Sequence, residues 1–100
     1  MDIAEFRESL KKNDTPPATL GAALQALWWD AKDDWQRAHE TAQKDEGPEG
    51  SWVHAYLHRK AGDLPNAKYW YRRAGRAAGY GDHDREWEAI VAWLLRVAEE

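Results

Sequence analysis

Apolar side chains recur at intervals of three and four along nearly the whole chain, and no segment alternates strictly between apolar and polar residues. The first spacing places side chains on one face of an α-helix, whereas alternation is typical of a half-buried strand. The pattern therefore predicts an all-α protein. We expect one domain, 1–100, in which two helical pairs at about 20–46 and 51–78 are flanked by capping helices at about 2–12 and 83–99.

Residues typical of helix starts support these boundaries. Asp2 precedes Glu5 by three positions, which is the spacing of a capping box. Asp34 is expected to cap the third helix and Ser51 the fourth, since short oxygen-bearing side chains satisfy the first free N–H groups of a helix. The Gly-Asp pair at 62–63 is expected to end the fourth helix and begin the fifth.

The two helical pairs resemble each other at a shift of 29 residues. The matched positions are Leu24 with Val53, Leu27 with Tyr56, Trp28 with Leu57, Asp34 with Asp63, and Ala38 with Ala67. Self-similarity of this kind is the signature of stacked helical repeats, whose end units need covering helices. We therefore expect two stacked helix-turn-helix units.

The segment 60–74 carries a family resemblance. It runs Lys-Ala-Gly-Asp-Leu-Pro-Asn-Ala-Lys-Tyr-Trp-Tyr-Arg-Arg-Ala, with Ala67, Tyr71 and Ala74 spaced by four and three. This segment resembles the turn and second helix of tetratricopeptide or Sel1-like repeats. With the blocks 26–32 and 52–60, it is similar to a group of small tetratricopeptide-like helical-repeat proteins. The resemblance implies an array of two antiparallel helix hairpins with flanking capping helices, and it transfers no site.

Charge is distributed unevenly over a chain whose net charge is −4. Residues 52–76 contain six Lys or Arg and one acidic residue, Asp63. An acidic chain repels phosphate outside such a patch, so nucleic acid is not an expected partner. A protein or peptide partner with an acidic segment, or a small anion, fits this segment better.

The chain contains no cysteine, which excludes disulfides and thiolate metal sites. No apolar run approaches the ~20 residues of a membrane span, and the first residues are acidic where a signal peptide would be basic. We expect a cytoplasmic protein that does not associate with membranes.

Two histidines on the fourth helix are the first candidate for a site. His54 and His58 are four residues apart, so they project from the same side, beside Arg59 and the repeat counterpart Trp29. Three interpretations stay open: a metal site, a patch that contacts a polar or anionic ligand, or two half-exposed histidines bonded to neighbouring helices. Zinc takes three or four protein ligands and no third His or Cys lies at a motif spacing, so we expect no metal and no cofactor.

A basic face on the fifth helix is the second candidate. Lys68, Arg72 and Arg76 follow one another at intervals of four residues, with Tyr69 and Arg73 beside them. Guanidinium groups bind carboxylates and phosphates through paired hydrogen bonds, so this face suits an acidic partner or an anion. The other interpretation is a solvated face whose aliphatic stems cover neighbouring rings.

Seven tryptophans in 100 residues supply much of the expected core. Trp28, Trp35, Trp70 and Trp87 lie on the apolar faces of their helices and are expected to be core residues. Trp93 lies off the stripe of the last helix, which makes it a candidate contact for a homodimer.

The sequence favours a non-enzymatic interaction module that binds a partner peptide or a small anion on a Trp/His/Arg surface. The surface comprises Trp29, His54, His58, Arg59, Lys68, Tyr69, Arg72 and Arg73. Two alternatives remain: a small metal-dependent or His-based hydrolase centred on His54 and His58, and a structural oligomerisation domain. The chain has neither a Gly-rich phosphate loop nor a Cys nucleophile, so enzymatic activity is the less favoured interpretation. The sequence leaves open the identity of the ligand, the pathway, the oligomeric state and the role of the two histidines.

Overall fold

A computed structural model describes residues 1–99, and within them the chain forms six α-helices and no strand. The all-α prediction is therefore confirmed. The helices are α1 Ile3–Lys12, α2 Ala22–Ala31, α3 Trp35–Ala42, α4 Pro48–Lys60, α5 Leu64–Ala74 and α6 His83–Ala98.

Several helix starts lie where the sequence predicts them. At α1, the Asp2 carboxylate accepts a hydrogen bond from Glu5 N at 2.8 Å, and Asp2 N donates to the Glu5 carboxylate at 3.3 Å. This reciprocal pair is a complete capping box. The carboxylates of Asp34 and Asp63 likewise accept hydrogen bonds from backbone N–H groups three residues on and cap α3 and α5.

The start of α4 was predicted wrongly. Its N-cap is Gly47 and its first residue Pro48, so 48–50 are helical and Ser51 lies inside the helix, 2% exposed. Proline suits the first position of a helix because its φ angle is already helical and the N–H that it lacks has no partner there. Asp45 helps to fix this start, since its carboxylate accepts a hydrogen bond from Gly47 N at 2.9 Å.

The end of α5 also differs from the prediction. The helix stops at Ala74 because Gly75 adopts the left-handed conformation, with φ 71°. This conformation costs glycine little, and it commonly terminates helices. Residues 76–78, expected to be helical, therefore belong to the connection that leads to α6.

The turns within the two hairpins have the same backbone structure. Asp33 has φ 61° and its counterpart Gly62 has φ 84°. In the first turn, Asp33 N and Asp34 N donate to the carbonyls of Asp30 and Trp29. In the second turn, Gly62 N and Asp63 N donate to the residues found 29 positions later, Arg59 and His58. The internal similarity of the sequence thus has a local structural counterpart.

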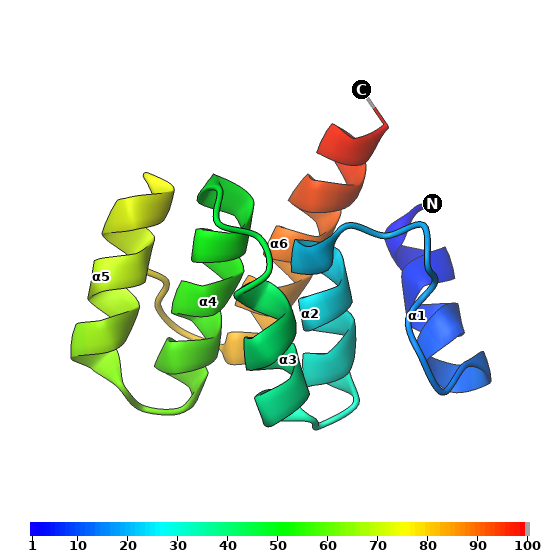
Figure 1. The fold of residues 1–100 in the computed structure, drawn as a ribbon, viewed down its shortest axis with the longest axis horizontal. Coiled ribbons are helices and arrows are strands. Elements are labelled where there is room, and N and C mark those ends of the chain that lie inside the picture. The colour runs from blue at the N-terminus through cyan, green and yellow to red at the C-terminus, as the bar shows by residue number, and fades with distance from the viewer. Residues whose placement is uncertain (100) are drawn as a thin grey trace.

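The helices lie side by side in the order α5, α4, α3, α2, α1, and α6 runs behind them (Figure 1). Contacts join α2 to α3 and α4 to α5, and these are the two hairpins. The hairpins meet through contacts of α4 with α2 and α3, while α6 packs against α1, α2 and α4. α6 therefore holds both hairpins together.

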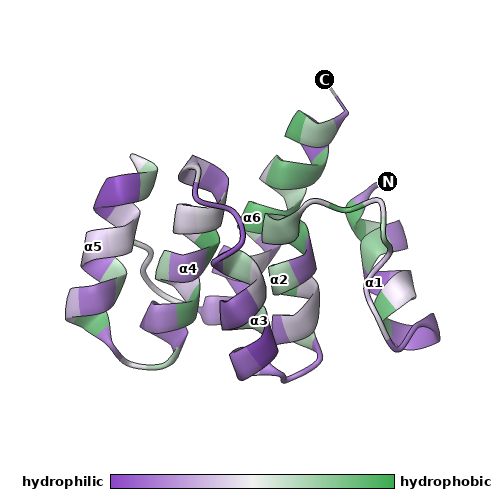
Figure 2. Ribbon diagram, viewed as in Figure 1, coloured by the Kyte–Doolittle hydropathy of each residue, from purple (hydrophilic) through white to green (hydrophobic). Residues whose placement is uncertain are grey.

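One hydrophobic core is shared by α1, α2, α3, α4 and α6, and the most apolar ribbon segments lie in α2 and α6 (Figure 2). Its large members include Phe6, Leu27, Trp28, Tyr56, Leu57, Trp87 and Ile90. Trp87 is buried together with its polar atom, since its Nε1 donates to the Leu27 carbonyl at 2.9 Å. The core positions predicted for Trp28 and Trp87 are confirmed.

Among residues 1–99, no helix combines the length and the apolar character needed to cross a lipid bilayer.

Candidate functional site

Three histidine side chains from two neighbouring helices meet in one cluster. His54 and His58 lie one turn apart on α4, and their rings stack with centroids 4.8 Å apart. His39 comes from α3, and its ring meets those of His54 and His58 edge to face, with centroid distances of 4.6 and 5.1 Å. A ligand nitrogen from each of the three lies within 4.8 Å of the other two. We call these three residues the histidine cluster.

Two indole rings enclose the histidine cluster. Trp70 of α5 stacks on His54, with centroids 3.9 Å apart. Trp35 of α3 stacks on His39 at 4.9 Å and meets His58 edge to face at 5.9 Å. Trp35 is itself fixed, because its Nε1 donates to the Leu57 carbonyl at 2.9 Å. Both tryptophans are half-buried and pack against the buried core residues, so each belongs to the edge of the core and also forms a wall of the cluster.

The structure corrects two expectations about the histidines. His54 is 5% exposed, not half-exposed. Among residues 1–99, no hydrogen bond from another side chain or from the backbone engages any of the three rings, so the expected bonds to neighbouring helices are absent. His39 is the third ring that the sequence spacing did not reveal. The sequence contained one indication of its position: His39 lies four residues after Trp35 and therefore shares a face of α3 with an apolar ring.

The cluster keeps its imidazoles neutral. Burial, and then the proximity of His39 and His58, lowers the pKa of His54 to about 4. Burial also lowers the pKa of His39, against the nearby charge of Glu40, and that of His58, against the charge of Asp63. A neutral imidazole has a free nitrogen lone pair, which is the form that binds a metal ion or accepts a hydrogen bond. Among the described residues, the histidine cluster is the set whose geometry can hold a metal.

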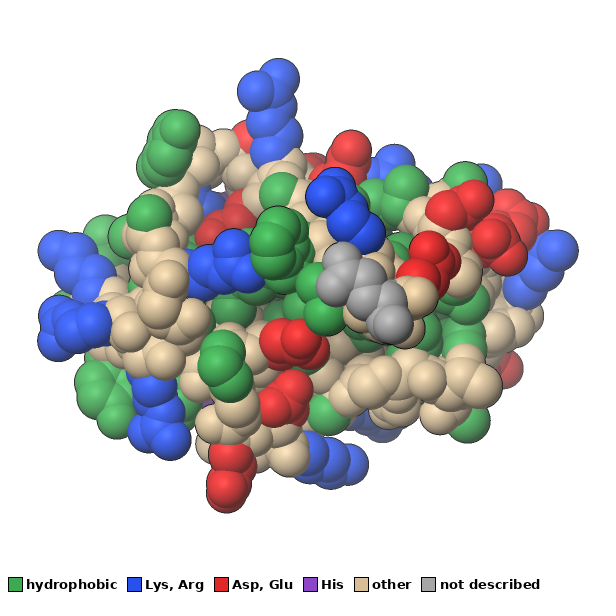
Figure 3. Space-filling model, turned by 90° about the horizontal axis from the view of Figure 1, so that it is seen from above, with side chains coloured by type: hydrophobic (Ala, Val, Ile, Leu, Met, Phe, Trp, Pro, Cys, Tyr) green, Lys and Arg blue, Asp and Glu red, His purple; other side chains and the backbone are tan. Residues whose placement is uncertain are grey.

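The predicted basic face of α5 is exposed. Lys68, Arg72 and Arg73 are exposed, and so is Tyr69, whose hydroxyl accepts a hydrogen bond from Arg73 Nη1 at 3.3 Å. Basic side chains gather at the α5 end of the molecule (Figure 3). The guanidinium of Arg73 lies 5.2 Å from the ring centre of Trp70. The basic face therefore borders the histidine cluster through a shared indole.

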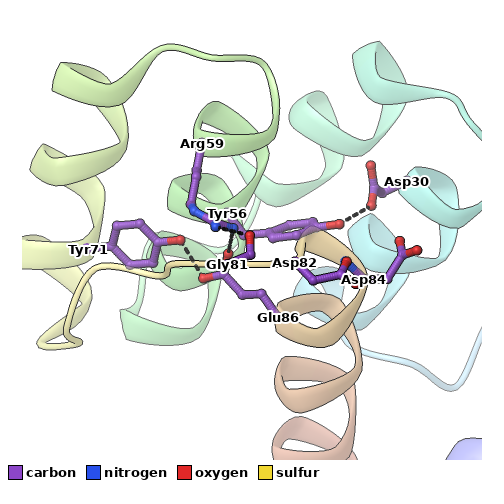
Figure 4. A network of polar contacts seen from close by, with 8 residues as sticks. All are labelled: Asp30, Tyr56, Arg59, Tyr71, Gly81, Asp82, Asp84 and Glu86. Carbon is purple, nitrogen blue, oxygen red and sulfur yellow. Dashed lines mark hydrogen bonds and ion pairs between the residues drawn. The ribbon is translucent and has the colours of Figure 1, made fainter.

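Arg59 lies in a different environment from the one predicted. It is paired with Glu86 of α6 at 2.9 Å, and its Nη2 donates to the Gly81 carbonyl at 2.5 Å. The Tyr71 hydroxyl also donates to Glu86, so one carboxylate ties α4 and α5 to α6 (Figure 4). Both charged side chains are about nine-tenths buried. Arg59 thus joins elements of the fold and is not a surface contact for a ligand.

A second buried carboxylate joins α2 to α4. Asp30 is 3% exposed and accepts hydrogen bonds from Tyr56 Oη at 2.8 Å and Lys60 Nζ at 3.0 Å (Figure 4 shows the former). These residues line one side of a cleft of about 510 Å³ between α1 and the nearby ends of α2, α4 and α6. The cleft is lined by charges of both signs and by Trp87, and the histidine cluster lies outside it.

The other two tryptophans singled out by the sequence have contacts of their own. Trp29 is half-buried, and its ring meets Trp28 edge to face and lies under the guanidinium of Arg37 at 4.3 Å. The ring contacts of Trp29 therefore do not include His54 or His58, with which the sequence analysis grouped it. Trp93 is 41% exposed, and Arg76 lies 4.6 Å from its ring centre. The homodimer contact through Trp93 stays a prediction.

Comparison of the chain with protein-family models, with curated proteins and with solved structures found no match.

Proposed function

We propose that this chain is a non-enzymatic interaction module that binds an acidic peptide segment along α5. Its two hairpins are proposed to stack as in tetratricopeptide or Sel1-like repeats, whose surfaces serve as extended binding faces. The repeated left-handed turns at Asp33 and Gly62 support this arrangement.

The unpaired charge of α5 is the observation that carries the proposal. In the described part of the chain, the ion pairs of basic side chains involve Arg7, Lys12, Arg37, Arg59 and Lys60, and none involves α5. Lys68, Arg72 and Arg73 are exposed and lack an acidic partner within this part. The guanidinium group of arginine binds a carboxylate through two parallel hydrogen bonds, and charge complementarity steers an acidic segment to such a face.

Apolar surface beside these charges supports a peptide rather than a free ion. Tyr69 is 49% exposed and Leu64 54% exposed on the same helix. Exposed tyrosines are frequent anchors in protein interfaces because they offer a large ring and a hydroxyl together. Side chains of a peptide bound along α5 would pack on these two residues while its carboxylates pair with the arginines.

The hydrolase alternative has less support from geometry. A hydrolase centred on His54 and His58 needs a substrate cleft beside those imidazoles, and the 510 Å³ cleft is lined by other residues.

The test is binding of a fluorescein-labelled hexaglutamate peptide, followed by anisotropy at low and moderate salt. We expect binding that weakens with salt and a loss of affinity of about tenfold or more in an R72E/R73E variant. A K11E/K12E variant carries the same net charge with the change on α1, so it should bind within about twofold of the parent. Equal losses in both variants, or no loss in either, would contradict a site on α5.

A further inference from the structure

The histidine cluster supports an inference that goes beyond peptide binding and does not depend on it. We propose that His39, His54 and His58 bind a divalent transition metal ion of the zinc class, each through one ring nitrogen.

The placement of the three rings is the first support. A tetrahedral zinc site with Zn–N bonds of ~2.0–2.1 Å holds its ligand nitrogens about 3.3 Å apart. The ligand nitrogens of the cluster already lie within 4.8 Å of one another. Closing the difference requires rotation of the half-buried rings of His39 and His58 about their side-chain bonds. The backbone need not move, because α3 and α4 are packed neighbours and His54 and His58 already lie one helical turn apart on α4.

The lack of competing partners for the rings is the second support. No competing hydrogen bond from residues 1–99 has to break before the rings bind. His54 is 5% exposed and has no hydrogen-bond partner within residues 1–99, and a bound ion would supply one.

The walls of the cluster are the third support. Stacked rings limit the orientations that an imidazole adopts. Trp70 stacks on His54 with an interplanar angle of 17°, and Trp35 stacks on His39 with an interplanar angle of 11°. Trp35 is itself tied to α4 by its bond to the Leu57 carbonyl.

The ligand set selects the class of ion. Imidazole nitrogen suits Zn²⁺, Cu²⁺ and Ni²⁺, whereas Mg²⁺ and Ca²⁺ take oxygen ligands. Within residues 1–99 the cluster includes no carboxylate, and the chain has no cysteine. Three protein ligands leave a fourth position of a tetrahedral ion for water.

The test uses the full chain without an affinity tag, freed of metal with a chelator. CoCl₂ is added first, because cobalt in a tetrahedral site absorbs visible light, and ZnCl₂ is then added to displace it. Calorimetry with ZnCl₂ gives the stoichiometry, and thermal unfolding is followed with ZnCl₂ or MgCl₂. We expect one ion per chain, a cobalt band that zinc abolishes, and a midpoint of unfolding that rises with zinc and not with magnesium.

Variants separate this site from adventitious binding. His39→Gln and His58→Gln are each expected to weaken zinc binding by about tenfold or more. The control His83→Gln removes the fourth histidine of the chain, which lies at the start of α6 outside the cluster, and should leave affinity unchanged. A folded parent with no cobalt band and no zinc heat overturns the proposal, whatever the variants do. Unchanged affinity in His39→Gln also overturns it, because the α4 pair alone would then account for the binding.

Discussion

His54 is the residue at which stability and binding conflict most directly. It occupies a buried position, yet within residues 1–99 its ring has no hydrogen-bond partner, only ring contacts with Trp70 and the other two imidazoles. Burial of an imidazole that lacks a protein partner costs part of its hydration. Polar groups with displaced pKa values are typical of functional sites.

The first prediction concerns the pH dependence of stability in metal-free protein. The pKa of His54 is about 4 in the folded chain and should be ordinary, about 6.5, when unfolded. As pH falls from about 6.5 to about 4, the unfolded chain gains a proton that the folded chain does not, so stability falls. The expected loss is on the order of 3 kcal/mol, measured by urea unfolding.

A His54→Phe variant is the matched control because it keeps an aromatic ring and cannot titrate. Its free energy of unfolding should fall less over the same pH range than that of the parent, the difference being the His54 contribution. NMR of the parent should show an imidazole that stays neutral well below pH 6. If parent and variant lost stability in parallel, His54 would not have the depressed pKa argued above.

At the scale of elements, the two hairpin turns use the same backbone conformation with different residues. Asp33 and Gly62 both lie in the left-handed region, which an L side chain adopts at a cost of roughly 1–2 kcal/mol and glycine adopts freely. The adjoining caps Asp34 and Asp63 are the same residue with the same bond to the helix. The turns therefore form a natural pair for comparison.

The second prediction is that substitutions at these two left-handed positions change the free energy of unfolding in opposite directions. Gly62→Ala should lower the free energy of unfolding by roughly 1–2 kcal/mol, although open space surrounds the added Cβ, because φ must stay positive. Asp33→Gly should raise it by roughly 0.5 kcal/mol, since relief of strain exceeds the added freedom of the unfolded chain. Chemical denaturation of both variants checks the signs. A destabilised Asp33→Gly would mean that the aspartate side chain contributes more than its backbone strain costs.

At the scale of the molecule, α6 is the element on which both hairpins depend. It buries Trp87, Ile90, Val91, Leu94 and Leu95 in the shared core, and its Glu86 pairs with Arg59 and Tyr71. By contrast, Phe6 is the buried residue of α1. The two flanking helices therefore contribute unequally, although the sequence presents both as covers for the ends of the repeat.

The third prediction follows from this inequality. Removing residues 82–100 takes away burial worth about 10 kcal/mol, which is comparable to the whole stability of a small domain. We expect that chain to lose its cooperative thermal transition. Removing residues 1–17 costs about 3–5 kcal/mol, mostly through Phe6, and should leave a cooperative transition at a lower temperature. Circular dichroism during heating distinguishes the two. The reverse result would show that α1, not α6, completes the core.

The sequence alone was sufficient for features that depend on near neighbours in the chain. Helix periodicity, the caps at Asp2, Asp34 and Asp63, and the buried positions of Trp28 and Trp87 follow from residues within about one turn of each other. The start of α4 was the local exception. Both Pro48 and Ser51 are residues typical of helix starts, and the helix begins at Pro48.

The tertiary structure decided how helices share a site. His39 joins His54 and His58 only because α3 packs on α4 at a particular rotation, and spacing along the chain carries no information about that rotation. The same holds for Arg59, whose partner Glu86 lies 27 residues away on α6. Local periodicity determines which face of a helix is apolar, but the crossing of helices, set by packing of the whole core, determines which polar side chains meet at its edge.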